Sequence, residues 1–160
     1  MDAQIANSLL DLNLRFYRQF GKAFAETRRR IQPGVRRALQ LLPELTSAAG
    51  GGRWLDLGCG NGALAAAWAR SGFGGTYTGV DFSPELLNEA RVFLDETLAV
   101  LPKPLPHSFR FLQADLSQPA WIAVLGGERF DGVLAFAVLH HLPGGDLRLR
   151  LMKQVRGLLE

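Results

Sequence analysis

Trp54-Leu-Asp-Leu-Gly-Cys-Gly-Asn-Gly-Ala63 is the stretch that decides the fold. Its first four residues are mostly apolar, too few for a helix and typical of a buried strand. Every second residue is then a glycine, at Gly58, Gly60 and Gly62, as in a turn that needs positive φ angles. The alanine-rich segment that follows predicts a helix. A strand, a glycine turn and a helix bring backbone N–H groups toward a ligand. The stretch therefore predicts a cofactor loop, with a plain strand-to-helix turn as the alternative.

The glycine spacing alone does not name the cofactor, because Gly58-x-Gly60-x-x-Ala63 also satisfies the dinucleotide fingerprint. Carboxylates add a second signal, since three predicted strands end in succession at Asp56, Asp81 and Asp115. Ligands bind at the carboxyl ends of parallel strands, so acids in series at that edge predict one ligand site. Asp81 lies 25 positions after Asp56, a separation that suits an acid bound to ribose hydroxyls. Capping of the following helix is the alternative for each acid taken alone.

Composition limits the class of protein. The chain has 160 residues, 48% of them hydrophobic and 21% charged, as expected for one globular domain. Its single cysteine, Cys59, excludes an internal disulfide and a cysteine-rich zinc site, and no metal site is expected. No apolar run approaches the about 20 residues of a membrane span, and the N-terminus lacks a signal-peptide pattern. The sequence therefore predicts a cytoplasmic protein with no membrane partner.

Charge and periodicity divide the chain into two parts. Residues 1–43 carry a net charge of +5 within an overall +3, and such asymmetry suggests a partner for the basic end. Apolar residues at three- and four-residue steps predict helices over 7–26 and 35–45, although Pro43 favours an early end for the second. We therefore predict a basic helical cap over residues 1–48 and a cofactor-binding region over residues 49–160.

Strands and helices alternate in the second part. Besides the strand at 54–57, we predict strands at 76–80, 109–113 and 131–138, and helices at 84–100, 118–125 and 146–159. This alternation predicts an α/β fold with a doubly wound parallel Rossmann-like sheet in the order 3-2-1-4. The last strand is almost entirely apolar, so it is expected to be central and buried on both faces.

Four motifs in order now suggest a family. They are Leu55-Asp-Leu-Gly-Cys-Gly-Asn-Gly62, Gly79-Val-Asp-Phe-Ser83, Gln113-Ala-Asp-Leu116, and the segment from Phe130-Asp131 to His141-Leu142. Over residues 50–160 the chain resembles the class I S-adenosylmethionine-dependent methyltransferases. The chemistry agrees with this resemblance. S-adenosyl-L-methionine has no pyrophosphate, so its loop needs no cation, and its sulfonium and ammonium groups favour nearby carboxylates.

The resemblance implies a role for each matching residue. Asp56 and the backbone of Gly58 and Gly60 would hold the methionine end of the cofactor. Asp81 would bind the ribose hydroxyls, and Phe82 beside it joins the cofactor-binding set. Asp115 would accept a hydrogen bond from the adenine amino group near the Leu116 N–H, and Ala135 would lie under the methionine. A dehydrogenase is the alternative, but it has no role for Asp115.

The N-terminal part resembles a narrower group. Phe16-Tyr17-x-x-Phe20, Phe24-Ala-Glu-Thr-Arg28 and Gln32-Pro-Gly-Val35 look like the lead-in of the tRNA wobble-uridine carboxymethyl methyltransferases. In that group the acceptor is a carboxylate on uridine-34, which is already ionised at neutral pH and needs alignment rather than a strong base. The resemblance implies tRNA as partner. The arginines that could contact its phosphates are Arg28, Arg29, Arg30, Arg36 and Arg37, with solvated helix ends as the alternative.

Two histidines follow the fourth strand. His140 and His141 would lie close to the transferred methyl group, where a histidine can position an acceptor or act as a weak base. His140 is the candidate catalytic residue. A turn histidine that caps the next helix is the alternative, and it is the favoured interpretation for His141.

The chain departs from the family at its end. Members of this fold normally continue into three more strands, whereas this sequence stops at Glu160. We therefore expect a C-terminally truncated form whose strand at Gly132 to Val138 is an open edge suited to self-association. Three hypotheses follow: a tRNA methyltransferase, a small-molecule methyltransferase, and a cofactor-binding module without turnover.

Overall fold

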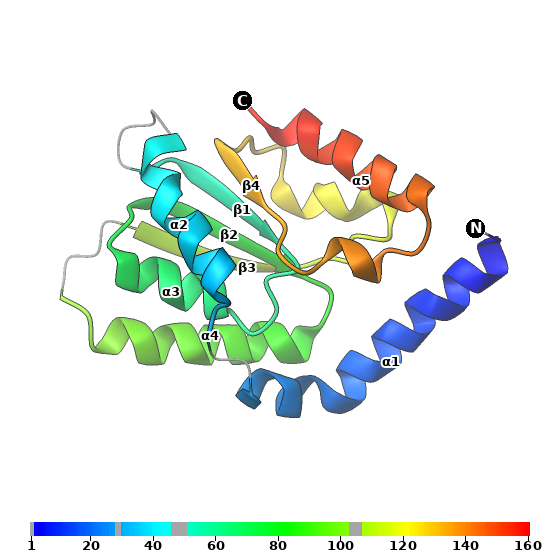
Figure 1. The fold of residues 1–160 in the computed structure, drawn as a ribbon, viewed down its shortest axis with the longest axis horizontal. Coiled ribbons are helices and arrows are strands. Elements are labelled where there is room, and N and C mark those ends of the chain that lie inside the picture. Colours follow the sequence, from blue (N-terminus) through cyan, green and yellow to red (C-terminus); the bar gives the residue numbers. More distant parts are fainter. Residues whose placement is uncertain (1, 28–29, 46–50, 103–106) are drawn as a thin grey trace.

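Helices and strands alternate after two N-terminal helices in the computed structural model, which describes residues 2–27, 30–45, 51–102 and 107–160 (Figure 1). The strands are β1 (Arg53–Leu57), β2 (Gly75–Asp81), β3 (His107–Gln113) and β4 (Gly132–Leu134). The α-helices are α1 (Ala3–Thr27), α2 (Pro33–Leu45), α3 (Ala63–Ser71), α4 (Pro84–Ala99) and α5 (Gly145–Leu158). Two 3₁₀ helices complete the set, η2 (Pro119–Leu125) and η3 (Leu139–His141). Within these described ranges no helix combines the length and the apolar character needed to cross a bilayer.

The sheet confirms the predicted order. Its four strands are parallel and run β3-β2-β1-β4, with β1 hydrogen-bonded on both sides. Alternation along β1 sends Leu55 and Leu57 to one face and Trp54 and Asp56 to the other. All four side chains are buried, because helices cover both faces of the sheet. The glycine turn after β1 consequently opens at the carboxyl edge of a sheet that is covered on both sides.

Each face of the sheet has its own hydrophobic cluster. Leu55 and Leu57 pack with α5 and η2 through residues such as Leu151 and Trp121. On the opposite face, α2, α3 and α4 cover a cluster that combines aromatic and aliphatic side chains (Figure 1). Its buried members include Trp54, Trp68 and Tyr77, whose rings lie in contact. These two clusters hold β1 and β2 in place, so the side chains at their ends have defined positions.

Local signals place most helix ends. Ser83 caps α4, because its hydroxyl accepts a 3.2 Å hydrogen bond from the Leu86 N–H, and Pro84 opens the helix as predicted. The predicted helix over 118–125 is a 3₁₀ helix that ends at Gly126 with a φ of 62°. The expectation that Pro43 ends the second helix early is wrong, since α2 continues to Leu45.

The fourth strand differs from its prediction. Only residues 132–134 pair with β1, rather than 131–138, and Ala135 beyond them is exposed. Pairing stops at Asp56 and Leu134, one residue before β1 ends at Leu57, because the chain leaves the sheet after Leu134. The chain instead turns over the glycine loop, with Ala137 at a φ of 52° and Val138 against Gly58.

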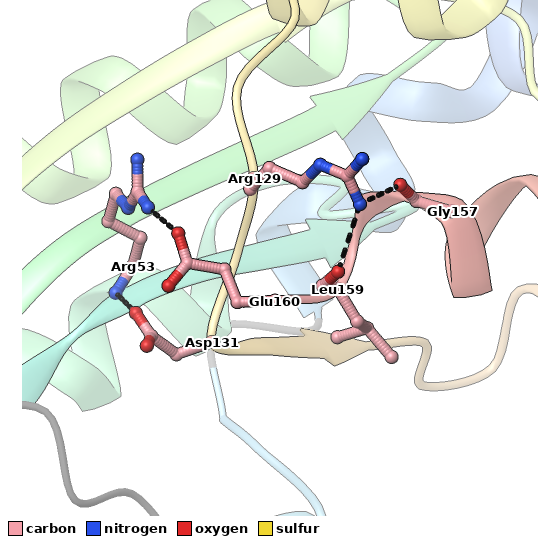
Figure 2. A network of polar contacts seen from close by, with 6 residues as sticks. All are labelled: Arg53, Arg129, Asp131, Gly157, Leu159 and Glu160. Atoms are coloured by element: carbon pink, nitrogen blue, oxygen red, sulfur yellow. Dashed lines mark hydrogen bonds and ion pairs between the residues drawn. The ribbon is translucent and has the colours of Figure 1, made fainter.

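The last residues return to the sheet beside β4. The Phe130 N–H donates to the Leu158 carbonyl at 2.8 Å, and the Glu160 N–H donates to the Phe130 carbonyl at 3.2 Å, which forms a parallel bridge. Side chains reinforce this bridge (Figure 2). Arg129 donates to the Gly157 carbonyl at 2.7 Å, and Glu160 forms an ion pair with Arg53. This bridge lies just before the predicted open edge and covers none of its residues. Self-association through that edge, Gly132 to Val138, stays a prediction.

Candidate active site

A cavity of about 260 Å³ lies at the carboxyl ends of β1 and β2 and of the segment that follows β3. Three parts of the chain line it. The strand-end loops supply one wall, including all three predicted carboxylates. The N-terminal cap supplies a second wall from α1 and from residues 30–35, and the segment after β4 supplies a third. The structure thus brings Asp56, Asp81 and Asp115 to one cavity, as their positions at successive strand ends predict.

The glycine loop has two structural glycines and one that faces open space. Gly58, Gly60 and Gly62 have φ angles of 69°, 53° and 73°, which strongly favour glycine. A Cβ on Gly58 would lie 2.7 Å from Val138, and one on Gly62 would lie 2.8 Å from Ala90. A Cβ on Gly60 would meet nothing within 4 Å, and this residue lines the cavity. Gly60 is therefore the point at which a ligand can approach the loop backbone.

Asp81 braces this loop from the end of β2. One carboxylate oxygen accepts a 3.0 Å hydrogen bond from the Gly60 N–H, and the other accepts a 2.9 Å bond from the Ser83 N–H. Burial raises the pKa of Asp81, and these backbone donors oppose that rise because they favour the ionised form. The sequence assigns Asp81 to ribose hydroxyls. Its second task, holding Gly60 in place, is visible only in the structure.

Asp56 is in a different environment. Its side chain is only 3% exposed, and the Tyr77 hydroxyl donates to one of its oxygens. Burial raises the pKa of Asp56 to about 7, the Tyr77 hydrogen bond lowers it in part, and the charge of Asp81 raises it further. Asp56 is therefore close to equally neutral and ionised at neutral pH. No motif in the sequence indicates Tyr77 as its partner.

The remaining predicted cofactor residues divide between the cavity and its surroundings. Asp115 lines the cavity and also accepts a 2.8 Å hydrogen bond from the Ser117 N–H in the turn after β3, but it does not cap η2, whose N-cap is Gln118. Leu116 and Phe82 line the cavity. Ala135 is exposed and is not among the lining residues, whereas the next three residues, Phe136, Ala137 and Val138, line the cavity.

The N-terminal cap contributes a wall that the motifs did not reveal. Leu10, Asn13, Leu14 and Tyr17 occupy one face of α1 and line the cavity. Their spacing of three and four residues was visible in the sequence, but periodicity does not say which of several apolar residues turn inward. The Tyr17 ring packs edge-on against Phe82 at 5.6 Å, which joins the cap to the strand-end wall.

The cap also contacts the histidines. The Tyr17 hydroxyl and the Nε2 atom of His141 lie 3.2 Å apart, and the Asn13 side-chain amide donates to the His141 carbonyl at 3.1 Å. Burial lowers the pKa of His141, and the nearby His140 lowers it further. His140, the predicted catalytic residue, is exposed and absent from the cavity lining. The residue at the cavity is therefore His141, because the η3 turn directs the two neighbouring side chains differently.

The predicted arginines are only partly described. Arg28 and Arg29 lie outside the described residues, whereas Arg36 and Arg37 are exposed on α2. Arg30 lines the cavity, and among the described lining residues it alone carries a fixed positive charge. The described residues contain no group of three side chains placed to hold a metal ion. The cavity thus combines an acidic wall at the strand ends with a cation, a tyrosine and a histidine on the opposite side.

Comparison with known proteins agrees with this geometry. The sequence model of a family described as "Methyltransferase domain" matches residues 55–160. A probable methyltransferase, ltbC of Aspergillus luteorubrus, is 27% identical over 106 residues, which are 66% of this chain and 35% of that protein. The match therefore spans about a third of that relative.

Solved structures extend the comparison to the fold. The CcbJ methyltransferase of Streptomyces caelestis is 27% identical with a TM-score of 0.61, over 81% of this chain and 49% of the other. Magnesium protoporphyrin IX methyltransferase of Synechocystis PCC 6803, solved with bound SAH, is 25% identical with a TM-score of 0.59, over 79% and 51%. The four-stranded sheet and its helices match Rossmann-like methyltransferase structures, and the chain spans about half the length of these relatives.

Proposed function

This chain belongs to the methyltransferase domain family, and from that premise we propose that it binds S-adenosylmethionine in the cavity and transfers a methyl group from it. The observation that carries the proposal is the acidic wall. Asp56, Asp81 and Asp115 line one cavity beside a glycine loop whose central residue is open to a ligand. This arrangement favours a ligand that carries positive charge and hydroxyl groups.

The residues present fit this cofactor. Gly60 leaves space above the loop, where any larger side chain would intrude on a ligand. The described strand-end wall contains no cation that could neutralise a pyrophosphate, which argues against a dinucleotide. At one end of this wall the Asp56 carboxylate suits an ammonium group. Toward the other end, Asp81 and Asp115 suit ribose and adenine. When bound, S-adenosylmethionine supplies a methyl group on a positively charged sulfur that an acceptor lone pair can take directly.

The chain's own residues then have separable tasks. Asp81 fixes Gly60 and keeps an acceptor edge for ribose hydroxyls, while Asp56 provides negative charge for the methionine end. Leu116 and Phe82 add apolar surface that excludes water from the adenine side. The rate gain expected from such a site comes mostly from orientation of two reactants and from electrostatics.

The cap side is the proposed acceptor wall. Tyr17, His141 and Arg30 line it and offer a hydroxyl, an imidazole and a cation to a polar acceptor. A small-molecule acceptor is the first candidate, because the α1 helix closes over the cavity and leaves a limited volume. The names of the relatives agree with this, since one of them acts on magnesium protoporphyrin IX.

The carboxylate of a tRNA wobble uridine is the second candidate. It is supported by the N-terminal resemblance and by Arg30, Arg36 and Arg37, which are exposed near α2. Arg30 also lines the cavity, so it could pair with an acceptor carboxylate. Only the tRNA candidate requires contacts between arginines and phosphates, and such contacts weaken as the salt concentration rises.

Calorimetric titration with S-adenosylhomocysteine tests the cofactor assignment. We expect micromolar binding to the unmodified chain and at least a tenfold loss in Asp81→Ala. Asp95→Ala, an exposed aspartate on α4, is the matched control and should bind normally. The absence of binding by the folded chain would overturn the assignment.

Radiolabelled methyl transfer then separates the acceptors. Incubation with total tRNA and, separately, with a panel of small carboxylic acids, phenols and amines should label only one class. Labelling of tRNA that falls as salt is raised and is weakened by Arg36→Ala would favour the second candidate. Labelling of a small acceptor alone would favour the first.

A further inference from the structure

We propose that Asp56 and Tyr77 form a proton-releasing pair in the cofactor site, in which the neutral form of Asp56 gives up its proton when the positively charged cofactor enters. On binding, the Asp56 proton passes to solvent and the carboxylate becomes the counter-ion of the methionine end. Tyr77 is a positioning residue in this scheme, because it holds the carboxyl group through a hydrogen bond. The inference rests on the proposed cofactor and adds a residue and a proton to that site.

The sheet register creates the pair. Asp56 lies between Gly79 of β2 and Leu134 of β4, so neither of its two paired residues has a polar side chain. The slot above Gly79 is already filled, since a Cβ there would lie 2.8 Å from the Cys59 sulfur and 2.9 Å from Phe111. Tyr77, two residues before Gly79, reaches Asp56 from the same face and donates its hydroxyl hydrogen. Tyr77 is fully buried, so the hydroxyl is fixed in that position.

The surroundings disfavour a negative charge on Asp56. Its face of the sheet carries the cluster of Trp54, Tyr77 and Leu134, which offers no cation. Among the described residues no ion pair includes Asp56. An isolated carboxylate buried in such a place is costly, and protonation removes that cost.

Titratable groups reach Asp56 from several elements. Tyr77 and Asp81 approach from β2, and Cys59 approaches from the glycine loop. Arg30 and His141 line the same cavity from the cap and from η3. The largest influence on the pKa of Asp56 is burial, which raises it to about 7. Tyr77 stays protonated as a donor, because burial raises its own pKa well above its usual value.

Asp81 supplies the contrast within the same site. Backbone N–H groups of Gly60 and Ser83 donate to it, so its negative charge has fixed partners. Asp56 has one hydroxyl donor and an apolar face. A ligand with an ammonium group therefore changes the charge state of Asp56 more than that of Asp81. The affinity for such a ligand should rise with pH, by up to about tenfold per unit below the midpoint, and become level above it.

Calorimetry can count the released proton. S-adenosylhomocysteine is titrated at pH 7 in phosphate and in Tris, buffers that take up a proton with very different enthalpies. We expect the observed binding enthalpy to differ between the buffers by the amount for a fraction of one released proton. Adenosine, which lacks the ammonium group, is the matched ligand and should give a smaller difference. Equal enthalpies with intact S-adenosylhomocysteine binding would overturn this inference and leave the proposed function standing.

Two variants test the pair itself. Asp56→Asn should bind with a buffer-independent enthalpy and a level pH profile. Tyr77→Phe removes the donor that favours the ionised carboxylate, so the midpoint of the pH profile should move upward, with affinity lost at pH 7 and recovered near pH 9. A uniform loss at every pH would mean that Tyr77 only fills space. No S-adenosylhomocysteine binding by the unmodified chain in any buffer would overturn the proposed function and the inference with it.

Discussion

The strand-end wall and the cap wall of the cavity are built by different kinds of contact. At the strand ends, backbone groups make most of the hydrogen bonds: Asp81 accepts from Gly60 and Ser83, and the Gly58 N–H donates to the Val80 carbonyl at 2.8 Å. At the cap, side chains from distant parts of the sequence meet, as Tyr17 does with His141, 124 residues later. The first wall is fixed once β1 and β2 form, whereas the second depends on how α1 docks.

This difference has consequences for stability and motion. Buried backbone hydrogen bonds open only with the whole sheet, while a helix attached through partly exposed side chains can open on its own. Helix α1 packs mainly against α4, and the N-terminal end of α1 lies apart from the other helices (Figure 1). Substitutions at the strand ends should therefore affect the whole domain, and those at the cap should act locally.

The largest change in the free energy of unfolding is expected from a substitution at Asp56, and its size should depend on pH. The pKa of Asp56 is about 7 in the folded chain, against an ordinary value of 3.8. The folded chain therefore has its full stability below pH 3.8, where Asp56 is neutral, and loses stability as the pH rises through 7 and Asp56 ionises. Asp56→Asn keeps the acceptor for Tyr77 without the charge. It should stabilise the ligand-free chain at pH 8.5 by up to about 4 kcal/mol and have little effect near pH 4.

Urea unfolding of Asp56→Asn at several pH values measures this difference. Asp95→Asn is the control, because the exposed Asp95 should give the same stability as the unmodified chain throughout. A stability gain from Asp56→Asn that does not change with pH would contradict the prediction.

The second effect compares two glycines of one loop. Gly58→Ala adds a Cβ 2.7 Å from Val138 at a φ of 69°, and overlap together with backbone strain should cost about 3 kcal/mol. Gly60→Ala has a similar φ but open space, so it should cost about 1 kcal/mol of stability. Its S-adenosylhomocysteine affinity should nevertheless fall, because the new methyl group faces the cavity. Equal stability losses in the two variants would contradict this explanation.

A third comparison places one substitution in α4, behind the strand-end wall, and one in α1, which carries the cap wall. Ser83→Ala removes the cap of α4 and should cost about 1 kcal/mol. Ser8→Ala removes a hydroxyl in α1 that bonds only to the Gln4 carbonyl within the same helix, so it should be neutral or slightly stabilising. Thermal unfolding of both variants measures the difference. A loss in Ser8→Ala as large as in Ser83→Ala would mean that α1 and α4 unfold as one tightly coupled unit.

The strand-end wall was predictable because its signals are local. Glycines that need positive φ, a Ser-Pro helix start and acids that close apolar runs all act within a few residues of their own position. Strand order followed from alternation and from right-handed crossovers. The bond between Asp56 and Tyr77 escaped prediction because it depends on the register of two strands, which the motifs do not contain.

The misplaced expectations share one physical cause. The apolar run over 131–138 suggested a long buried strand, but the chain leaves the sheet after Leu134, so Ala135 is exposed and the chain turns at Ala137. That turn also decides which histidine reaches the cavity. Composition reports how apolar a segment is, whereas the path of the backbone decides how much of it can pair.

Tyr17→Phe should give the smallest effect and the most local one. It removes the hydroxyl that bonds to His141, at a cost of about 0.5 to 1 kcal/mol because water can partly replace a half-exposed bond. Amide hydrogen exchange should speed up in α1 and stay unchanged in β1 and β2. Faster exchange throughout the sheet would instead make the cap part of the cooperative core.

Acid should reproduce the effect of Tyr17→Phe in the unmodified chain. Burial lowers the pKa of His141 below its ordinary 6.5. The folded chain therefore has its full stability above pH 6.5, where the imidazole is neutral, and loses stability as the pH falls below that value and the imidazole is protonated. A protonated His141 can no longer accept from Tyr17, and α1 exchange, corrected for the intrinsic pH dependence, should rise toward that of the variant. If His141 instead donates to Tyr17, the unmodified chain and Tyr17→Phe will keep a constant difference across this range. The same titration therefore also identifies the direction of the hydrogen bond that holds the cap.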